Sequence, residues 1–140
     1  MKNNKKGFTL VELLAVIVIL AVVILIAVTA VLPRMEKARK NSFVDEALAY
    51  IKAAQEANVA SQMNGGSGTT CFSIENDLNG SYIEKKGDTY TGVVEKSGNN
   101  WVIYIKGAKY MINGKTQPFT IEGDNASVEA AGTLTKTSCS

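Results

Sequence analysis

Apolar residues dominate the start of the sequence. Every residue from Leu13 to Val28 is apolar, and only Thr29 interrupts the run before Leu32. About 20 apolar residues in an α-helix span roughly 30 Å, which is the thickness of the hydrocarbon core of a bilayer. The pattern therefore predicts a membrane-spanning helix.

After Pro33 the apolar residues recur at steps of three and four, as in a helix with one apolar face. This stripe consists of Val44, Ala47, Leu48, Ile51 and Ala54. The two patterns join into one helix from Phe8 to about Met63, and the glycine-rich residues 64–68 should end it. Pro33 lacks an N–H and clashes with the preceding turn, so we expect a helix kink near Thr29.

From residue 89 the apolar positions alternate, which is typical of β-strands. We expect strands at residues 89–95, 101–105 and 109–112. Asn113-Gly114 predicts a hairpin turn into a fourth strand at residues 116–121. Short strands with close turns form an antiparallel sheet, one face of which needs cover. We expect Trp101, Ile103 and Ile105 on that face, packed against Leu48 and Ile51 of the helix.

One acidic side chain stands at the edge of the apolar region. A carboxylate in lipid costs about 2.5 kcal/mol or more, so Glu12 is expected to have a partner. The surrounding run is Lys5-Lys6-Gly7-Phe8-Thr9-Leu10-Val11-Glu12-Leu13-Leu14. It resembles the class III signal of the type IV pilin family and of the related pseudopilins, because it combines a basic leader, a glycine, an aromatic residue and one acid at a fixed offset.

The resemblance implies a processing and assembly site. A prepilin peptidase would cleave between Gly7 and Phe8 and methylate the new N-terminal Phe8. Glu12 would be the assembly carboxylate, pairing with the α-amine of Phe8 in a neighbouring subunit. Such a pair would set the register of the subunits, because a buried unpaired charge is heavily penalised.

A basic start followed by an apolar run also fits a secretory signal peptide or a plain membrane anchor. A removable signal has an apolar region of about 7–15 residues followed by small residues. Here the run is longer, and Pro33-Arg34-Met35-Glu36 follows it. A plain anchor would gain nothing from Glu12. The prepilin interpretation is therefore favoured.

These patterns divide the chain into four parts. They are a leader peptide at residues 1–7, the membrane-spanning and assembly half of the helix at 8–33, its amphipathic half at 34–63, and an antiparallel sheet head with a loop and a C-terminal disulfide region at 64–140. The predicted fold is α+β, with a long N-terminal helix packed on a small antiparallel sheet, a pilin-like lollipop. The part after Leu32 is expected outside the cytoplasm, because the family's peptidase acts at the cytoplasmic face.

The chain has two cysteines, Cys71 and Cys139. An even number of cysteines in an exported domain suggests a disulfide, and many type IV pilins close their C-terminal region in this way. The bond would stabilise the fold by about 4 kcal/mol and hold a tail that otherwise frays. Two free or intermolecular thiols are the alternative.

The composition offers little for catalysis. There is no histidine, which is the commonest general base and metal ligand near neutral pH. Two cysteines cannot complete a four-ligand zinc site without carboxylates. Removing the leader takes away three of the 15 basic residues and leaves 12 against 13 acidic ones, so no strongly basic nucleic-acid face is evident. We expect no enzyme activity, no metal and no cofactor.

Several weaker patterns are interpreted as ordinary surface or core features. The sequons at Asn79-Gly80-Ser81 and Asn125-Ala126-Ser127 are short enough to arise by chance, and Asp124 with Asn125 is expected to be a solvated turn rather than a calcium site. The basic residues Arg34, Lys37, Arg39 and Lys40 are expected to form a solvated helix face, with lipid or DNA binding as the alternative. Packing, rather than stacking on the bases of a single-stranded nucleic acid, is the expected role of Phe72, Tyr82 and Tyr90.

The resemblance implies a structural subunit of a type IV pilus that mediates adhesion, motility or DNA uptake. Its partners would be other copies of the chain in a helical homopolymer, the prepilin peptidase, an assembly ATPase and a platform protein. The subunit would wait in the cytoplasmic membrane as a single-pass precursor and then enter an extracellular filament. The alternatives are a pseudopilin of a secretion or DNA-uptake system and a single-pass membrane-anchored binding module, while any surface or DNA ligand stays unspecified.

Overall fold

The computed structural model describes residues 7–84, 89–124 and 126–139. The chain divides into two compact units, Met1–Ala38 and Arg39–Ser140, and each is described by itself. Most of the expected leader, residues 1–6, lies outside the described residues, and so does Asn125 of the second sequon. The predicted α+β class is confirmed: a long apolar N-terminal helix continues into a segment that packs on a small antiparallel sheet.

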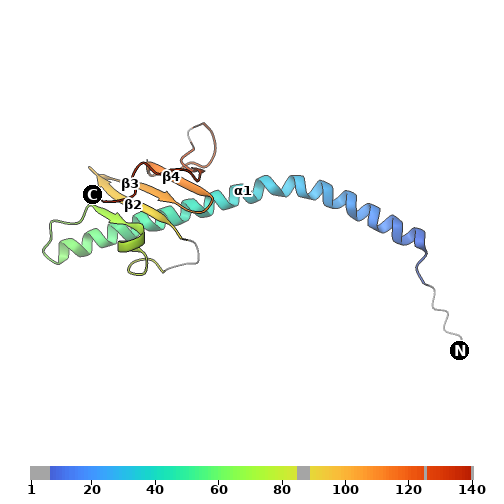
Figure 1. Ribbon diagram of the computed structural model, residues 1–140, viewed down its shortest axis with the longest axis horizontal. Helices are drawn as coiled ribbons and strands as arrows, with labels where there is room; N and C mark the ends of the chain where they lie inside the picture. The colour runs from blue at the N-terminus through green and yellow to red at the C-terminus, as the bar shows by residue number, and fades with distance from the viewer. Residues whose placement is uncertain (1–6, 85–88, 125, 140) are drawn as a thin grey trace, which may run out of the picture. The chain divides into compact units, whose positions relative to one another are not determined.

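The helix α1 runs from Leu10 to Met63 without interruption (Figure 1). It begins two residues later than predicted, because Thr9 caps it. The glycine-rich stop after Met63 is confirmed. The Gly65 N–H donates to the Gln62 carbonyl at 3.1 Å, and Gly65 adopts φ = +82°, a left-handed conformation that glycine tolerates best.

Within the described residues, five strands form one antiparallel sheet in the order β1-β2-β3-β4-β5. Their bounds are β1 Cys71–Ser73, β2 Thr91–Ser97, β3 Asn100–Lys106, β4 Tyr110–Thr116 and β5 Glu129–Ala130. The three central strands, labelled in Figure 1, confirm the predicted ones within a few residues. The short edge strands were not predicted, nor was the π-helical turn Ile74–Leu78 that follows β1.

The predicted hairpin turn at Asn113-Gly114 is wrong. Both residues lie inside β4, where Asn113 pairs with Tyr104 but Lys115 pairs with Ile103, so Gly114 is the extra residue of a β-bulge. Gly114 has φ = +66°. A glycine with positive φ serves a bulge as readily as a turn, and the sequence signal for the two is the same.

The fourth strand predicted at residues 116–121 is also wrong. After Thr116 the chain forms a loop that is closed where the Ser127 N–H donates to the Thr120 carbonyl at 2.7 Å. Pro118 within this segment has no N–H to give to a strand ladder. The neighbour of β4 in the sheet is β5 instead.

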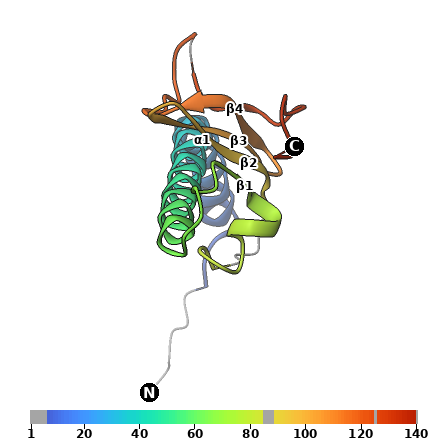
Figure 2. The same cartoon turned by 90° about the vertical axis from the view of Figure 1, so that its left-hand side faces the viewer.

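One face of the sheet packs on the second half of α1 and forms the main core, as Figure 2 shows. Ile103 and Ile105 are fully buried there together with Ile51, as predicted, and Trp101 is partly buried. Leu48 was expected in this contact, but 36% of it is exposed. The buried face is centred between Ala47 and Ala54, and Leu48 lies about 100° around the helix from Ala47, beyond its edge.

Two of the three aromatic residues expected to pack do so. Phe72 and Tyr90 belong to the core, whereas 42% of Tyr82 is exposed, so the packing prediction is wrong for Tyr82. Tyr82 belongs to the loop after the π-helical turn rather than to a strand, and no sheet face covers it.

The opposite face of the sheet is covered by the end of the chain, residues 131–139, which we call the C-terminal strap. Val93 pairs with Tyr104 and therefore points away from the main core, yet Val93 is fully buried. Leu134 of the strap is buried on this side, and its Cδ1 lies 3.2 Å from the position that a Cβ would take on Gly92. The polar, weakly patterned tail of the sequence is therefore a second packing layer.

Candidate processing and assembly site

The residues around the predicted cleavage point are open and not helical. Gly7, Phe8 and Thr9 precede α1, and 91% of Phe8 is exposed. A Cβ added to Gly7 would meet no atom within 4 Å. Peptidases bind peptide bonds in exposed, non-helical backbone, and residues 7–9 have that form.

Thr9 and Glu12 form a reciprocal capping box at the start of α1. The Thr9 N–H donates to Glu12 Oε2 at 2.9 Å, and the Glu12 N–H donates to Thr9 Oγ1 at 3.3 Å. These bonds satisfy two of the backbone N–H groups that a helix start leaves unpaired. The carboxylate also lies at the positive end of the helix dipole, which stabilises it.

The capping box was missed in the sequence, although the pattern that signals it is present. Threonine followed three positions later by glutamate, just before an apolar run, is a known helix-start signature. The local pairing means that Glu12 has a partner within its own chain before any cleavage. Among the described residues, Glu12 Oε1 has no hydrogen-bond partner, so one carboxylate oxygen is left for an external donor.

Phe8, Thr9 and Glu12 line one shallow pocket together with Gly7. The structure thus brings together the predicted cleavage, methylation and assembly residues where the chain enters α1. They are neighbours because of sequence spacing alone, since three or four positions on a helix correspond to about one turn.

No other described part of the chain covers the apolar half of α1. All its large side chains from Leu13 to Leu32 are about half exposed or more, and by length and composition this helix is able to cross a membrane. Exposed apolar surface of this extent marks a site of contact with lipid or with other proteins.

Pro33 lies inside α1, which continues through it. Because proline has no N–H, the Thr29 carbonyl lacks its usual helical donor. The Thr29 hydroxyl donates to the Ile26 carbonyl at 2.9 Å, which satisfies the side chain but not that carbonyl. The kink at Pro33 stays a prediction.

Cys71 and Cys139 are joined in a disulfide with their Cα atoms 5.6 Å apart. The bond ties the end of the C-terminal strap to the edge strand β1. Lys136 of the strap also forms an ion pair with Glu95 of β2, and Thr135 donates to Asn113 Oδ1 of β4 through both its N–H, at 3.0 Å, and its hydroxyl, at 2.9 Å. The strap is therefore attached to three strands, β4, β2 and β1.

The described residues contain no group of three or more His, Cys, Asp or Glu side chains that could hold a metal ion. Within the described part of the chain, the perturbed titratable group is Tyr50. Burial first, and then the negative charge of Glu46, raise the pKa of its phenol above the ordinary value of 10.0. Tyr50 donates a hydrogen bond to Asn79 and lies in the core, where it has a structural role.

Comparison with known families gives one match. Residues 2–28 match the family described as the prokaryotic N-terminal methylation motif. No curated protein and no solved structure matches the chain. The matched segment contains Gly7, Phe8 and Glu12 and suggests a structural, non-enzymatic protein. The match supports a class III signal peptide and a type IV pilin-family prepilin.

Proposed function

We propose that this protein is the structural subunit of a type IV pilus. The observation that carries the proposal is the position of Glu12, five residues after Gly7 within the N-terminal methylation motif and at the start of an uncovered apolar helix. The prepilin peptidase removes the leader, residues 1–7, and methylates Phe8. An assembly ATPase and a platform protein then move the subunit from the cytoplasmic membrane into the extracellular filament.

The filament is held together by the assembly half of the helix, residues 8–33. Its apolar side chains contact lipid in the precursor and the same segment of neighbouring subunits in the fibre. The amphipathic half, residues 34–63, carries the head, residues 64–140. A contact that repeats head to tail without closing produces an open helical polymer, which is the symmetry of a pilus.

Glu12 has two roles in this scheme. In its own chain it caps α1, and in the fibre its free oxygen accepts the α-amine of Phe8 from a neighbouring subunit. The pairing compensates the cost of placing a carboxylate among apolar helices. A subunit inserted at another register would leave both charges unpaired.

Two substitutions separate these roles. Glu12→Gln keeps the capping geometry, since glutamine serves the capping box as well as glutamate does, but removes the charge. Thr9→Ala removes the capping hydroxyl and keeps the charge. We expect Glu12→Gln and Glu12→Leu to accumulate as cleaved subunits in the membrane, and Thr9→Ala to assemble. Filaments formed by Glu12→Leu at the wild-type level would contradict the proposal.

The first measurement is the intact mass of the protein from filaments sheared off the cell surface. A chain that begins at methylated Phe8 and carries one disulfide supports a pilin. A cleaved chain that stays in the cell envelope favours a pseudopilin of a secretion or DNA-uptake system. An uncleaved chain in the membrane fraction favours a membrane-anchored binding module.

A further inference from the structure

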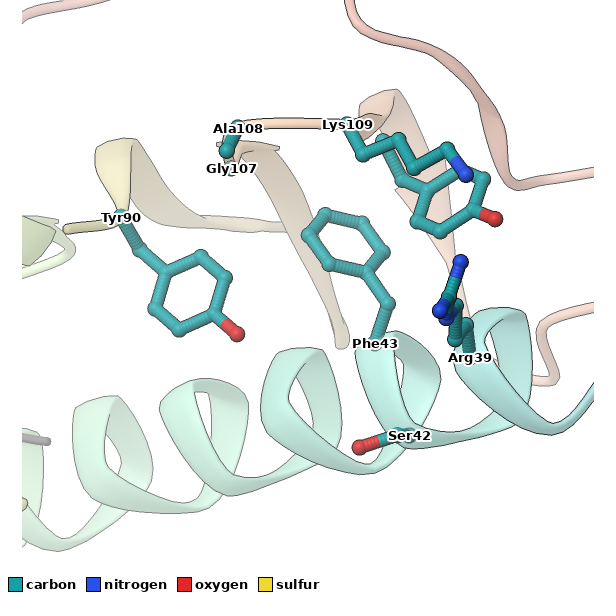
Figure 3. Close-up of a pocket in the computed structure, with 8 residues that line it drawn as sticks. Arg39, Ser42, Phe43, Tyr90, Gly107, Ala108 and Lys109 are labelled. Atoms are coloured by element: carbon teal, nitrogen blue, oxygen red, sulfur yellow. The ribbon is translucent and has the colours of Figure 1, made fainter. Parts of the chain in front are cut away.

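A pocket of about 300 Å³ lies between α1 and the turn that joins β3 to β4 (Figure 3). Aromatic rings of Phe43, Tyr90 and Tyr110 form part of its wall, and Arg39, Ser42 and Lys109 also line it. The Phe43 ring contacts both tyrosines, with centroid distances of 5.9 Å to Tyr90 and 6.1 Å to Tyr110. The pocket is therefore built on a rigid aromatic cluster.

The charged side chains that line this pocket in the described part of the chain, Arg39 and Lys109, are both positive. None of the described residues that line it is acidic, and neither Arg39 nor Lys109 forms an ion pair with another described residue. Figure 3 shows the two side chains coming from different elements, Arg39 from the helix and Lys109 from the turn before β4. Two uncompensated cations at one pocket attract an anion.

Tyr110 supplies a second and independent indication. Only 8% of this residue is exposed, and its buried hydroxyl has no hydrogen-bond partner among the described residues. A buried hydroxyl without a partner costs about 1–3 kcal/mol. Lys109 Nζ lies 5.9 Å from the centre of the Tyr110 ring, so a cation lies over the ring that carries the unsatisfied donor.

The geometry points to a binding site for the phosphate of a phospholipid headgroup. A phosphate group supplies what the pocket lacks: negative charge for Arg39 and Lys109, and an oxygen that accepts a hydrogen bond from the Tyr110 hydroxyl. Tyr110 lines the same pocket as these two long side chains, so movement of Arg39 and Lys109 would let a phosphate oxygen reach its buried hydroxyl. The inference rests on the membrane-resident stage of the proposed function.

The position of Arg39 in the sequence favours a lipid over a soluble anion. Arg39 follows Leu32, the last residue of the apolar run, by seven positions, which is about 10 Å of α-helix. The headgroup layer of a bilayer is roughly 5–8 Å thick on each side. Helical side chains lean towards the N-terminus of their helix, so a long arginine at this position reaches back into that layer.

The test uses the full-length precursor in detergent and counts bound lipid by native mass spectrometry. The probes are phosphatidylglycerol and diacylglycerol with identical acyl chains, which differ in the phosphoglycerol group alone. We expect phosphatidylglycerol to be retained several-fold more than diacylglycerol. Tyr110→Phe should lower that retention by about tenfold, because a hydrogen bond to a charged group is lost. Lys109→Gln should lower it by roughly threefold.

Three controls accompany these variants. Lys52→Gln removes an exposed lysine of α1 that does not line the pocket, and this variant should retain phosphatidylglycerol as the wild type does. Lys109→Arg keeps the positive charge and should retain phosphatidylglycerol at the wild-type level. Tyr110→Phe should unfold at or above the wild-type temperature, because the hydroxyl that it removes has no hydrogen-bond partner among the described residues. A loss of bound lipid in this variant would therefore not result from a loss of folded protein.

Equal retention of the two lipids, or wild-type retention by Tyr110→Phe, would overturn the inference. Inorganic phosphate and a DNA duplex are tested on the same variants. Binding of either one that depends on Lys109 and Tyr110, without a preference for phosphatidylglycerol, would also overturn it. Glu12→Leu should abolish filaments and keep lipid retention, so the proposed function and this inference fail independently.

Discussion

The Tyr50 hydroxyl donates a hydrogen bond of 2.7 Å to Asn79 Oδ1. Tyr50 lies on α1, and Asn79 ends the π-helical turn Ile74–Leu78, so the bond joins the helix to the segment that follows the first strand. The ring of Tyr50 also meets the Tyr90 ring edge-on at 5.9 Å. One tyrosine thus connects α1 both to the segment after β1 and to Tyr90, just before β2.

Tyr50→Phe should change the response of the head to alkaline pH. The pKa of Tyr50 is raised in the folded state, so the neutral phenol contributes stability that is present below its unfolded pKa and is lost as the pH rises through the folded pKa. The free energy of unfolding of the wild type should therefore fall more steeply above about pH 10 than that of the variant.

Trp101, the single tryptophan, reports unfolding of the head in denaturant, with the full chain in detergent. At neutral pH, Tyr50→Phe should be less stable by about 1 kcal/mol through the lost hydrogen bond. Tyr82→Phe is the matched control, because Tyr82 is exposed. Parallel pH profiles for wild type and Tyr50→Phe would contradict the assignment.

Removing the disulfide with Cys71→Ser and Cys139→Ser together should destabilise the head by about 4 kcal/mol, because the bond closes a loop between residues 68 positions apart. The loss of folded structure should begin in the C-terminal strap. Trypsin should cut after Lys136 faster in the double variant, since the strap then opens without unfolding of the sheet. Equal cleavage rates in the two proteins would show that the ion pair with Glu95 and the packing of Leu134 suffice to hold the strap.

Gly92→Ala should be the most damaging glycine substitution in the sheet. Gly92 has φ = +132°, and an added Cβ would collide with the Tyr104 carbonyl oxygen of β3. We expect a loss of about 3 kcal/mol or more. Gly98→Ala is the control: its φ is +62° with open space around it, so the loss should be about 1 kcal/mol. Similar losses for both would mean that the β2–β3 pair shifts to admit the methyl group.

Ile51→Ala and Leu48→Ala test which face of α1 is buried. Ile51 is 1% exposed and Leu48 is 36% exposed, although they lie only three positions apart. Ile51→Ala should cost about 2–5 kcal/mol through the cavity it leaves. Leu48→Ala should change the free energy of unfolding by less than about 1 kcal/mol. A large loss for Leu48→Ala would mean that the helix is rotated relative to the sheet.

The features that the sequence alone determined are those made by neighbouring residues. The helix, its glycine stop and the three central strands follow from periodicity, because hydrogen bonds and side-chain faces repeat over a few positions. The N-terminal motif is a linear pattern as well, and it places Gly7, Phe8 and Glu12 close together around the start of α1. The capping box of Thr9 and Glu12 was equally local and was readable from its spacing.

The tertiary structure decided what depends on residues that are distant in the chain. Asn113-Gly114 forms a bulge rather than a turn because Tyr104 and Ile103 on β3 pair on either side of it. The C-terminal strap becomes a packing layer because Val93 and Met111 leave an apolar face that needs cover. Arg39, Lys109 and the Tyr110 hydroxyl form a pocket only when α1 docks on β4. None of these contacts follows from a repeating pattern in the sequence, because each depends on which faces of the helix and the strands meet after folding.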